Sequence, residues 1–466
     1  MRPYQYCSKE ECTERQELGQ VSELEATLPT CCLQQSKRVL DPCIAVSKYR
    51  RSAAGGDDGR PVRTKEQLHR TLNHLVQICA TLRSTNHHPP VDNMETLVNF
   101  VVDRLRACQS DATRLMSNPI TCLPSSWHAK VIRILIWLRY ACCASAKADD
   151  TTANNTARTI HHMRSTAYDA YWNTIDSQHG VHDDEMLCYD AISRICAVVK
   201  HSATNYPTSL DTSWNGMLLE FQKRRRPGKI YPLWNLTLKI ASHARREEFY
   251  VLWKPDYPFS KELPVLAKSI LSVEVMLLGR YRTVQHYNKS FGKAEVVSDM
   301  NQLLGIIESD EGWSMEYANV FGIPVEETKT DSPTIQMTLK QVAMSDFDPN
   351  GLDTEILSRI QKSEHPWIFG EDFHRASDSP MGMSADSIRT LLEFGCGPKD
   401  QFDTPNNASI SSSDNTKSSL ARALAQSDAR TDTMEKSRAR NQGKKHGGPR
   451  KRFDGNRKHS SNRIKK

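Results

Sequence analysis

The feature that most constrains the fold is the helical spacing of apolar residues, which recurs throughout the first 280 residues of the chain. Residues 64–83 are typical, because Leu68, Leu72 and Leu75 lie on one stripe among polar neighbours. Apolar side chains three and four residues apart fall on the same face of an α-helix. This part of the sequence shows no alternating apolar and polar run of the kind that predicts a strand. We therefore expect a mainly α-helical fold.

The same periodicity predicts a series of helices. We expect them over residues 5–28, 41–54, 64–83, 93–116, 126–146, 158–178, 184–204, 213–226, 231–246 and 261–286. Residues 126–146 are apolar around most of the predicted helix, which is typical of a central, buried helix. The run ADDTTANNTART, residues 148–159, is rich in threonine and asparagine and is expected to form a polar loop.

The pattern changes after residue 285. Two short helices are expected over 294–306 and 310–325, followed by a strand over 334–338, an order typical of a small winged-helix module. Asp, Pro, Ser and Asn then dominate, so we expect the next segment to be largely disordered. The chain thus divides into an N-terminal segment (1–40), a helical domain (41–285), a winged-helix-like module (286–343), an acidic and polar linker (344–435) and a basic tail (436–466).

Positive charge is concentrated in the basic tail. The whole chain has a formal net charge of +7, but residues 436–466 hold thirteen Lys or Arg and one acid, so the remainder is mildly acidic. Such a tail favours binding to nucleic acid or to an import receptor, and a purely solubilising role is the alternative. The candidate contacts in the tail are Lys444, Lys445, Arg450, Lys451 and Arg452.

A second basic run connects two predicted helices and lies close to aromatic residues. It comprises Lys223, Arg224, Arg225, Arg226 and Lys229, with Tyr231 and Trp234 just beyond. Cations beside aromatic rings can hold phosphate groups and stack a nucleic-acid base. The alternative is an ordinary connection between helices whose charges are solvated. Both interpretations remain open at the level of sequence.

The sequence gives no indication of an enzyme or of a membrane protein. It contains no phosphate-binding P-loop, no dinucleotide-binding glycine pattern and no H-E-x-x-H motif. The thirteen cysteines include no C-x-x-C pair, which favours reduced thiols in the nucleus or cytosol. No apolar run reaches about 18 residues, so no transmembrane helix is predicted, and the polar first twenty residues do not suggest a secretory signal. The acidic trio Asp183, Asp184 and Glu185 is expected at the N-terminus of a helix, where negative charge is favourable.

Two sequence blocks and the segment before them resemble a known family. The run AVSKYRRSAAG, residues 45–55, is similar to the V-x-x-Y-x-R-S-A-A-G signature of the Sac-three/GANP family, and a cysteine- and glutamate-containing segment precedes it at 7–25. The signature residues in the first block are Tyr49, Arg51, Ser52, Ala53, Ala54 and Gly55. The run NFVVDRLRACQSDAT, residues 99–113, resembles the family's F-x-x-D-R-x-R-A-x-x-x-D block through Phe100, Asp103, Arg104, Arg106, Ala107 and Asp111.

This resemblance implies a superhelical, PCI-like helical domain closed by a winged helix. It also implies a scaffold without a cofactor or metal rather than an enzyme. Larger members of the family nucleate the TREX-two complex, which couples transcription to mRNA export at the nuclear pore, and short members have been tied to RNA processing or to centrosome and spindle function. The chain is similar to the short members, so we expect a nuclear protein that binds a second PCI and winged-helix protein together with RNA. An interaction protein of the centrosome or spindle is the alternative.

The charges of the signature are expected to be structural. Arg104 and Arg106 lie near Asp103 and Asp111 on one predicted helix, where such charges can pair. Lys48, Arg50 and Arg51 are expected to meet Glu10, Glu11 or Glu14 of the preceding segment. We favour ion pairs for these residues over direct contacts with RNA.

Overall fold

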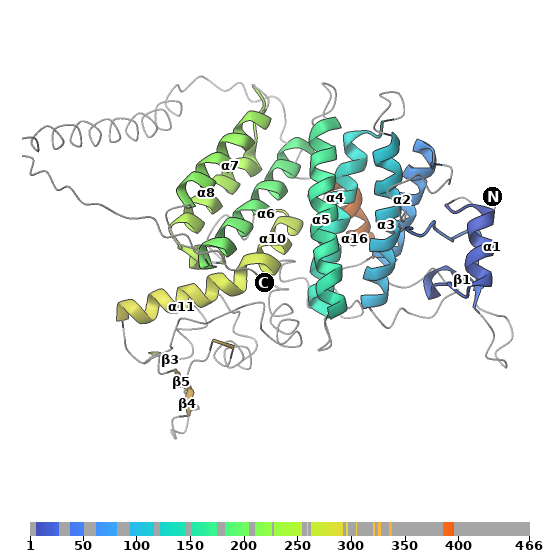
Figure 1. Cartoon of the computed structure of the whole chain (residues 1–466). Coiled ribbons are helices and arrows are strands. Elements are labelled where there is room, and N and C mark those ends of the chain that lie inside the picture. Colours follow the sequence, from blue (N-terminus) through green and yellow to red (C-terminus); the bar gives the residue numbers. More distant parts are fainter. Residues whose placement is uncertain are drawn as a thin grey trace, which may run out of the picture. The chain divides into compact units, whose positions relative to one another are not determined.

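The fold is mainly helical (Figure 1). The computed structural model describes residues 6–27, 38–50, 62–81, 94–115, 122–145, 151–174, 182–204, 210–225, 228–253, 259, 262–291, 295–296, 304, 320–321, 325–327, 335–337 and 385–395. No helix in this described part is long and apolar enough to cross a membrane.

The N-terminal segment contains less helix than the sequence predicts. Helix α1, Lys9–Glu17, begins where Ser8 Oγ accepts a hydrogen bond from the backbone N–H of Glu11, and it ends before Gly19. Gly19 has a φ of +66°, a left-handed conformation that glycine adopts easily and that stops the helix. The chain continues as a 3₁₀ turn, η1 (Glu23–Glu25), and a two-residue strand, β1 (Ala26–Thr27). The predicted single helix over 5–28 is therefore wrong.

The predicted helix over 41–54 is also wrong over the residues that the structure describes. Strand β2, Val39–Leu40, pairs antiparallel with β1, and a turn follows in which Asp41 Oδ1 accepts the N–H of Cys43. From there to residue 50 the chain has no regular secondary structure, apart from a bridge between Val46 and Tyr6. Val46, Ser47 and Lys48 donate their N–H groups to the preceding segment rather than to helical carbonyls, and Val46 donates to Glu25 Oε1 at 2.8 Å. Residues 51–54 lie outside the described part.

The helical body follows. Its helices are α2 (Lys65–Thr81), α3 (Met94–Leu115), α4 (Ser125–Ser145), α5 (Thr151–Thr174), α6 (Asp183–Thr204), α7 (Leu210–Arg224) and α8 (Pro232–Arg245), with a 3₁₀ turn η4 (Phe249–Val251). The predicted helices match these bounds within a few residues, except that α5 begins inside the predicted loop 148–159. Thr156 in this first part of α5 donates to Asn99 of α3 at 2.7 Å, so its polar residues are used between helices.

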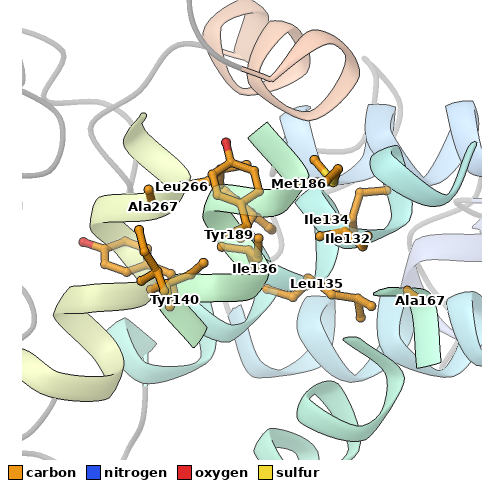
Figure 2. Close-up of a cluster of buried hydrophobic side chains, with 14 of the residues drawn as sticks. Ile132, Ile134, Leu135, Ile136, Tyr140, Ala167, Met186, Tyr189, Leu266 and Ala267 are labelled. Carbon is orange, nitrogen blue, oxygen red and sulfur yellow. The ribbon is translucent and has the colours of Figure 1, made fainter. Parts of the chain in front are cut away.

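Helix α4 forms the centre of the hydrophobic core, as the sequence predicts. It contacts α3, α5 and α10 (Val265–Leu271), and its apolar side chains are buried on every side. Figure 2 shows Ile132, Ile134, Leu135, Ile136 and Tyr140 of α4 among Ala167 of α5, Met186 and Tyr189 of α6, and Leu266 and Ala267 of α10. A helix that is apolar around its whole circumference is stable only when other helices surround it.

The last long helical stretch contains a local change of winding. Helix α10 passes into a π-helical turn, η5 (Ser272–Met276), and then into α11 (Leu277–Phe291). The sequence predicts this stretch as one helix over 261–286. Turn η4 packs closely on α11, because a Cβ on Gly279 would lie 3.0 Å from the Cβ of Phe249.

Three short antiparallel strands follow α11. They are β3 (Glu295–Val296), β4 (Val325–Glu327) and β5 (Ile335–Met337), and β5 pairs with both of the others. Strand β5 confirms the predicted strand over 334–338. Strand β3 contradicts the predicted helix over 294–306 at its start, and β4 begins at the last residue of the predicted helix over 310–325. Most of both predicted helices lies outside the described residues.

One further helix lies in the segment that the sequence assigns to a polar linker. Helix α16, Ala385–Phe394, packs on α2 and α4 and buries Ile388, Leu391 and Leu392 (Figure 1). No helix is predicted from the sequence in this segment. The remainder of the linker and the basic tail lie outside the described residues.

Candidate functional site

A buried carboxylate, Glu25, joins three separate segments of the chain. Its side chain is fully buried and accepts hydrogen bonds from Arg15 of α1, from Arg104 of α3 at 2.8 Å, and from the backbone N–H of Val46. Arg15 also donates to the carbonyl of Val46 at 3.0 Å. A buried charge is tolerated only when it is paired and hydrogen-bonded. Glu25 is therefore the centre of a network that fixes the N-terminal segment to the helical body.

The signature residues surround this network. The guanidinium of Arg106 lies 4.1 Å from the centre of the Tyr49 ring, and the N–H of Tyr49 donates to Asp103 at 3.3 Å. Arg104 pairs with Asp103 as well as with Glu25, and its guanidinium lies 4.6 Å from the ring of Phe100. The two signature blocks are thus in direct contact, although 54 residues separate Tyr49 from Asp103.

Two further ion pairs and one backbone hydrogen bond to a carboxylate connect neighbouring segments. Arg50 pairs with Glu14, the N–H of Lys48 donates to Glu11 at 2.7 Å, and Arg63 pairs with Asp111 at 2.5 Å. The structural ion pairs expected for Arg50 and Arg104 are confirmed. The remaining signature residues of the first block, Arg51, Ser52, Ala53, Ala54 and Gly55, lie outside the described part of the chain.

The basic run between α7 and α8 is engaged with acidic side chains. Arg224 donates to Asp190 at 2.7 Å and to Glu220 at 2.6 Å, and its guanidinium lies 5.0 Å from the ring of Trp172. Asp190 is buried and also accepts from Arg194 and from the indole N–H of Trp172. Arg224 is therefore held in a structural network between α5, α6 and α7.

Other cations of this run differ in their surroundings. Lys229 lies 3.5 Å from Asp183, and the guanidinium of Arg225 lies 5.2 Å from the centre of the Tyr231 ring. Lys223 is exposed in the last turn of α7. Arg226 lies outside the described residues, as do the tail candidates Lys444, Lys445, Arg450, Lys451 and Arg452.

The aromatic residues of this run cannot stack a base in this structure. Tyr231 and Trp234 are each 2% exposed, so neither presents a ring face to solvent. Their large apolar rings are more stable in the core between α7 and α8, where the Trp234 ring lies 5.9 Å from that of Phe221. The stacking part of the sequence interpretation is therefore wrong for these two rings, whereas phosphate contacts by the loop cations stay a prediction.

The acidic start of α6 serves a neighbouring helix as well as its own. Asp184 accepts the backbone N–H groups of Leu233 and Trp234 at 2.9 and 3.0 Å, and so caps the N-terminus of α8. Burial raises the pKa of Asp184, and the two N–H groups oppose that shift. Sequence reasoning placed the charge at the start of α6 but had no signal for a cap on a helix about 50 residues away.

Titratable groups with strongly shifted pKa values are scattered through the core. Burial lowers the pKa of His128 to about 4 and that of Lys268 to about 8. His128 lies on α4 and Lys268 on α10. In the described part of the chain, no three His, Cys, Asp or Glu side chains are grouped so that they could hold a metal ion.

The comparison with protein families agrees with this arrangement. The model of the SAC3/GANP family matches residues 6–306, which include the Glu25 network and all the helices from α1 to α11. The chain belongs to the SAC3/GANP family, a family of non-catalytic scaffolds that is associated with mRNA export and is generally nuclear. Neither the comparison with curated proteins nor that with solved structures gave a match.

Proposed function

We propose that this protein is a non-enzymatic nuclear scaffold that binds a PCI-type, winged-helix partner and RNA in mRNA export or processing coupled to transcription. The observation that carries the proposal is the family match over residues 6–306. The Glu25 network supports it, because it gives the signature residues a structural role in building the helical body. The three strands after α11 support a winged-helix module at the partner-binding end, since such a module pairs short helices with a small sheet.

RNA binding is assigned mainly to the basic tail. Arg224 and Lys229 of the loop already face acidic partners, which reduces the positive charge that they offer to phosphate. Residues 436–466 hold thirteen cations and one acid. The tail therefore provides most of the electrostatic attraction, and Lys223 and Arg226 add to it. Binding of this kind is independent of base sequence and weakens steeply with salt.

The partner is tested by purifying the tagged full chain from nuclear extract with and without nuclease and identifying the bound proteins by mass spectrometry. The expected result is a second winged-helix scaffold that survives nuclease, together with mRNA factors that nuclease removes. Recovery of centrosomal or spindle proteins, without RNA-linked factors in either sample, would contradict the proposal and favour the alternative role.

The RNA contact is tested with two full-length variants that each lose three positive charges. One carries Arg450→Gln, Lys451→Gln and Arg452→Gln in the tail, and the matched control carries Lys9→Gln in α1, Arg70→Gln in α2 and Lys239→Gln in α8, all at exposed positions. We expect only the tail variant to lose roughly ten-fold or more in affinity for single-stranded RNA and to reduce the slope of log K against log salt by about 2. Equal losses in both variants would refute a specific role of the tail.

A further inference from the structure

Helix α16 packs on the helical body through one apolar face, as a bound helical peptide would. Its apolar residues Ile388, Leu391 and Leu392 follow the i, i+3, i+4 spacing of one helix face, and all three are buried where α16 packs on α2 and α4. The outward face is exposed and carries Asp386, Ser387 and Thr390 together with the exposed ring of Phe394. Nearly 100 residues of sequence separate α11 from α16 (Figure 1). This arrangement is the geometry by which an amphipathic helix lies in an apolar groove.

The C-terminal end of α16 contacts Arg133, a buried cation that other residues of the helical body hold in place. Arg133 of α4 donates from Nη1 to the carbonyl of Glu393 at 2.9 Å. The guanidinium is fully buried and is held by Glu185 of α6 at 2.6 and 2.9 Å and by Nδ1 of His182 at 3.0 Å. Lys130, three residues before Arg133, is close enough to Glu393 for the two charges to interact. Cations at the C-terminus of a helix stabilise its dipole and its unpaired carbonyls.

Gly395, which follows the last residue of α16, has no room for a side chain. Gly395 has a φ of +84°, and its N–H donates to the carbonyl of Leu391 at 3.0 Å, which closes the helix. A Cβ at this position would lie 2.2 Å from Oε1 of Glu185, the same carboxylate that holds Arg133. Only glycine fits this conformation and this contact. The surface of α2 and α4 that α16 covers, called the groove below, therefore fits apolar residues at positions one, four and five of a helix and glycine at position eight.

The docked helix has little stability of its own. Its ten residues are fewer than an isolated helix needs in water, so its helical structure depends on the groove. Its favourable contacts are three buried apolar side chains and one hydrogen bond to a carbonyl. These contacts must offset the conformational entropy that is lost when the segment becomes ordered. What keeps the helix docked is its attachment to the same chain, which acts as a high effective concentration.

We propose that the groove between α2 and α4, with Arg133 and Glu185 at one end, is a binding site for a short amphipathic helix of this pattern, and that α16 is its reversible occupant within the chain. A partner protein that carries an apolar-x-x-apolar-apolar-x-x-Gly helix displaces α16 by competing for the same groove. The site thus gives the scaffold a second protein-binding surface, separate from the winged-helix module.

The test uses a fluorescent peptide of residues 384–395 and the full-length chain. We expect the peptide to bind a chain that carries Leu391→Ala and Leu392→Ala at least ten-fold more tightly than the native chain, whose groove α16 fills. A peptide with Gly395→Ala is the control and is expected to lose at least ten-fold in affinity for the same variant chain. Absence of peptide binding to a folded double variant, or equal binding of the control peptide, would overturn the proposal.

A second measurement does not depend on the folding of a variant. Hydrogen exchange of the native chain is expected to be at least ten-fold faster for the amides of α16 than for those of α2 and α4. Addition of excess unlabelled peptide should accelerate the exchange of α16 further, because the peptide captures the vacated groove. Exchange of α16 at the same rate as α2 and α4 would show that it is a fixed part of the core, and would also overturn the proposal.

Discussion

The N-terminal segment and helix α16 each contact the helical body at a buried pair of arginine and glutamate. The two contacts differ in whether the docked segment supplies one of the two charges. In the N-terminal anchor, Glu25 comes from the docked segment and Arg104 from α3, so the ion pair crosses the interface. In the C-terminal anchor, Arg133 and Glu185 both belong to the body, and α16 contacts this ion pair through the carbonyl of Glu393 without supplying either charge of the pair. Separating the first segment would break the buried pair between Glu25 and Arg104, whereas α16 can leave an intact ion pair behind. The first segment is therefore part of the fold, and the second is separable from it.

The largest expected effect comes from removing the charge at the N-terminal anchor. Glu25→Gln removes the buried carboxylate that Arg15 and Arg104 share, and we expect the free energy of unfolding to fall by about 3–5 kcal/mol. Denaturant unfolding followed by circular dichroism measures this change.

The matched control is Glu23→Gln, two residues away. Glu23 pairs with Arg38 at the surface, where the two side chains are 54% and 55% exposed, so the expected loss is about 0–1 kcal/mol. Similar losses of unfolding free energy in the two variants would contradict the claim that the buried Glu25 network fixes the N-terminal segment to the helical body.

The second effect concerns the ion pair beneath α16. Glu185→Gln deprives the buried Arg133 of its carboxylate but leaves it the contacts with His182 and the carbonyl of Glu393. We expect the free energy of unfolding to fall by about 2–3 kcal/mol, and α16 to exchange its amides faster. Asp386→Asn, at an exposed pair on α16 itself, is the control and should change neither quantity. An unchanged stability in Glu185→Gln would show that the pair does not hold the body together.

A smaller effect is expected from the anchoring leucines of α16. Truncation of a buried leucine commonly costs about 2–5 kcal/mol, but here the loss cannot exceed the free energy with which α16 is docked. Leu391→Ala with Leu392→Ala should therefore lower global stability by only about 1.5–2 kcal/mol, the docking free energy that a ten-fold or greater gain in peptide binding implies. Leu68→Ala with Leu72→Ala in α2 removes equally buried side chains and should show the full cost. Equal losses in the two double variants would make α16 part of the obligatory core.

The smallest expected effect is a pH dependence of the C-terminal anchor. Burial and the nearby Arg133 and Lys229 lower the pKa of His182, against the opposing charges of Glu185 and Asp183. The folded state therefore binds fewer protons at His182 than the unfolded state, and acidification below about 6.5 lowers the free energy of unfolding. Denaturant unfolding should show this loss between about pH 7.5 and pH 5.5. His182→Gln should make the loss smaller, and an unchanged pH dependence in that variant would assign it to other groups.

The helices of the body were predictable because burial of one face requires apolar residues at helical spacing, as in α2 and α3. The two segments that were predicted wrongly, residues 5–28 and 41–50, owe their shape to Gly19 and to hydrogen bonds with Glu25 that join positions far apart in sequence. No local pattern encodes such contacts. Helix α16 was missed because only ten residues carry its pattern within a polar segment, although Ile388, Leu391, Leu392 and Gly395 are a readable signal.

The candidate site was predictable to a similar extent. The sequence indicated ion pairs for Arg50 and Arg104, and the structure contains them. It could not indicate that Tyr231 and Trp234 are buried, because an aromatic residue beside a basic loop has the same local pattern whether it faces solvent or the core. Nor could it identify Glu25 as the shared partner of Arg15 and Arg104.

Hydrogen exchange of the native full-length chain in increasing denaturant tests the contrast between the two anchors most directly. The amides of β1, β2 and α3 around Glu25 are expected to exchange only through global unfolding, and those of α16 through a separate opening of much lower free energy. Exchange of α16 together with α3 at every denaturant concentration would contradict the account, as would an opening of the N-terminal segment that precedes that of α16.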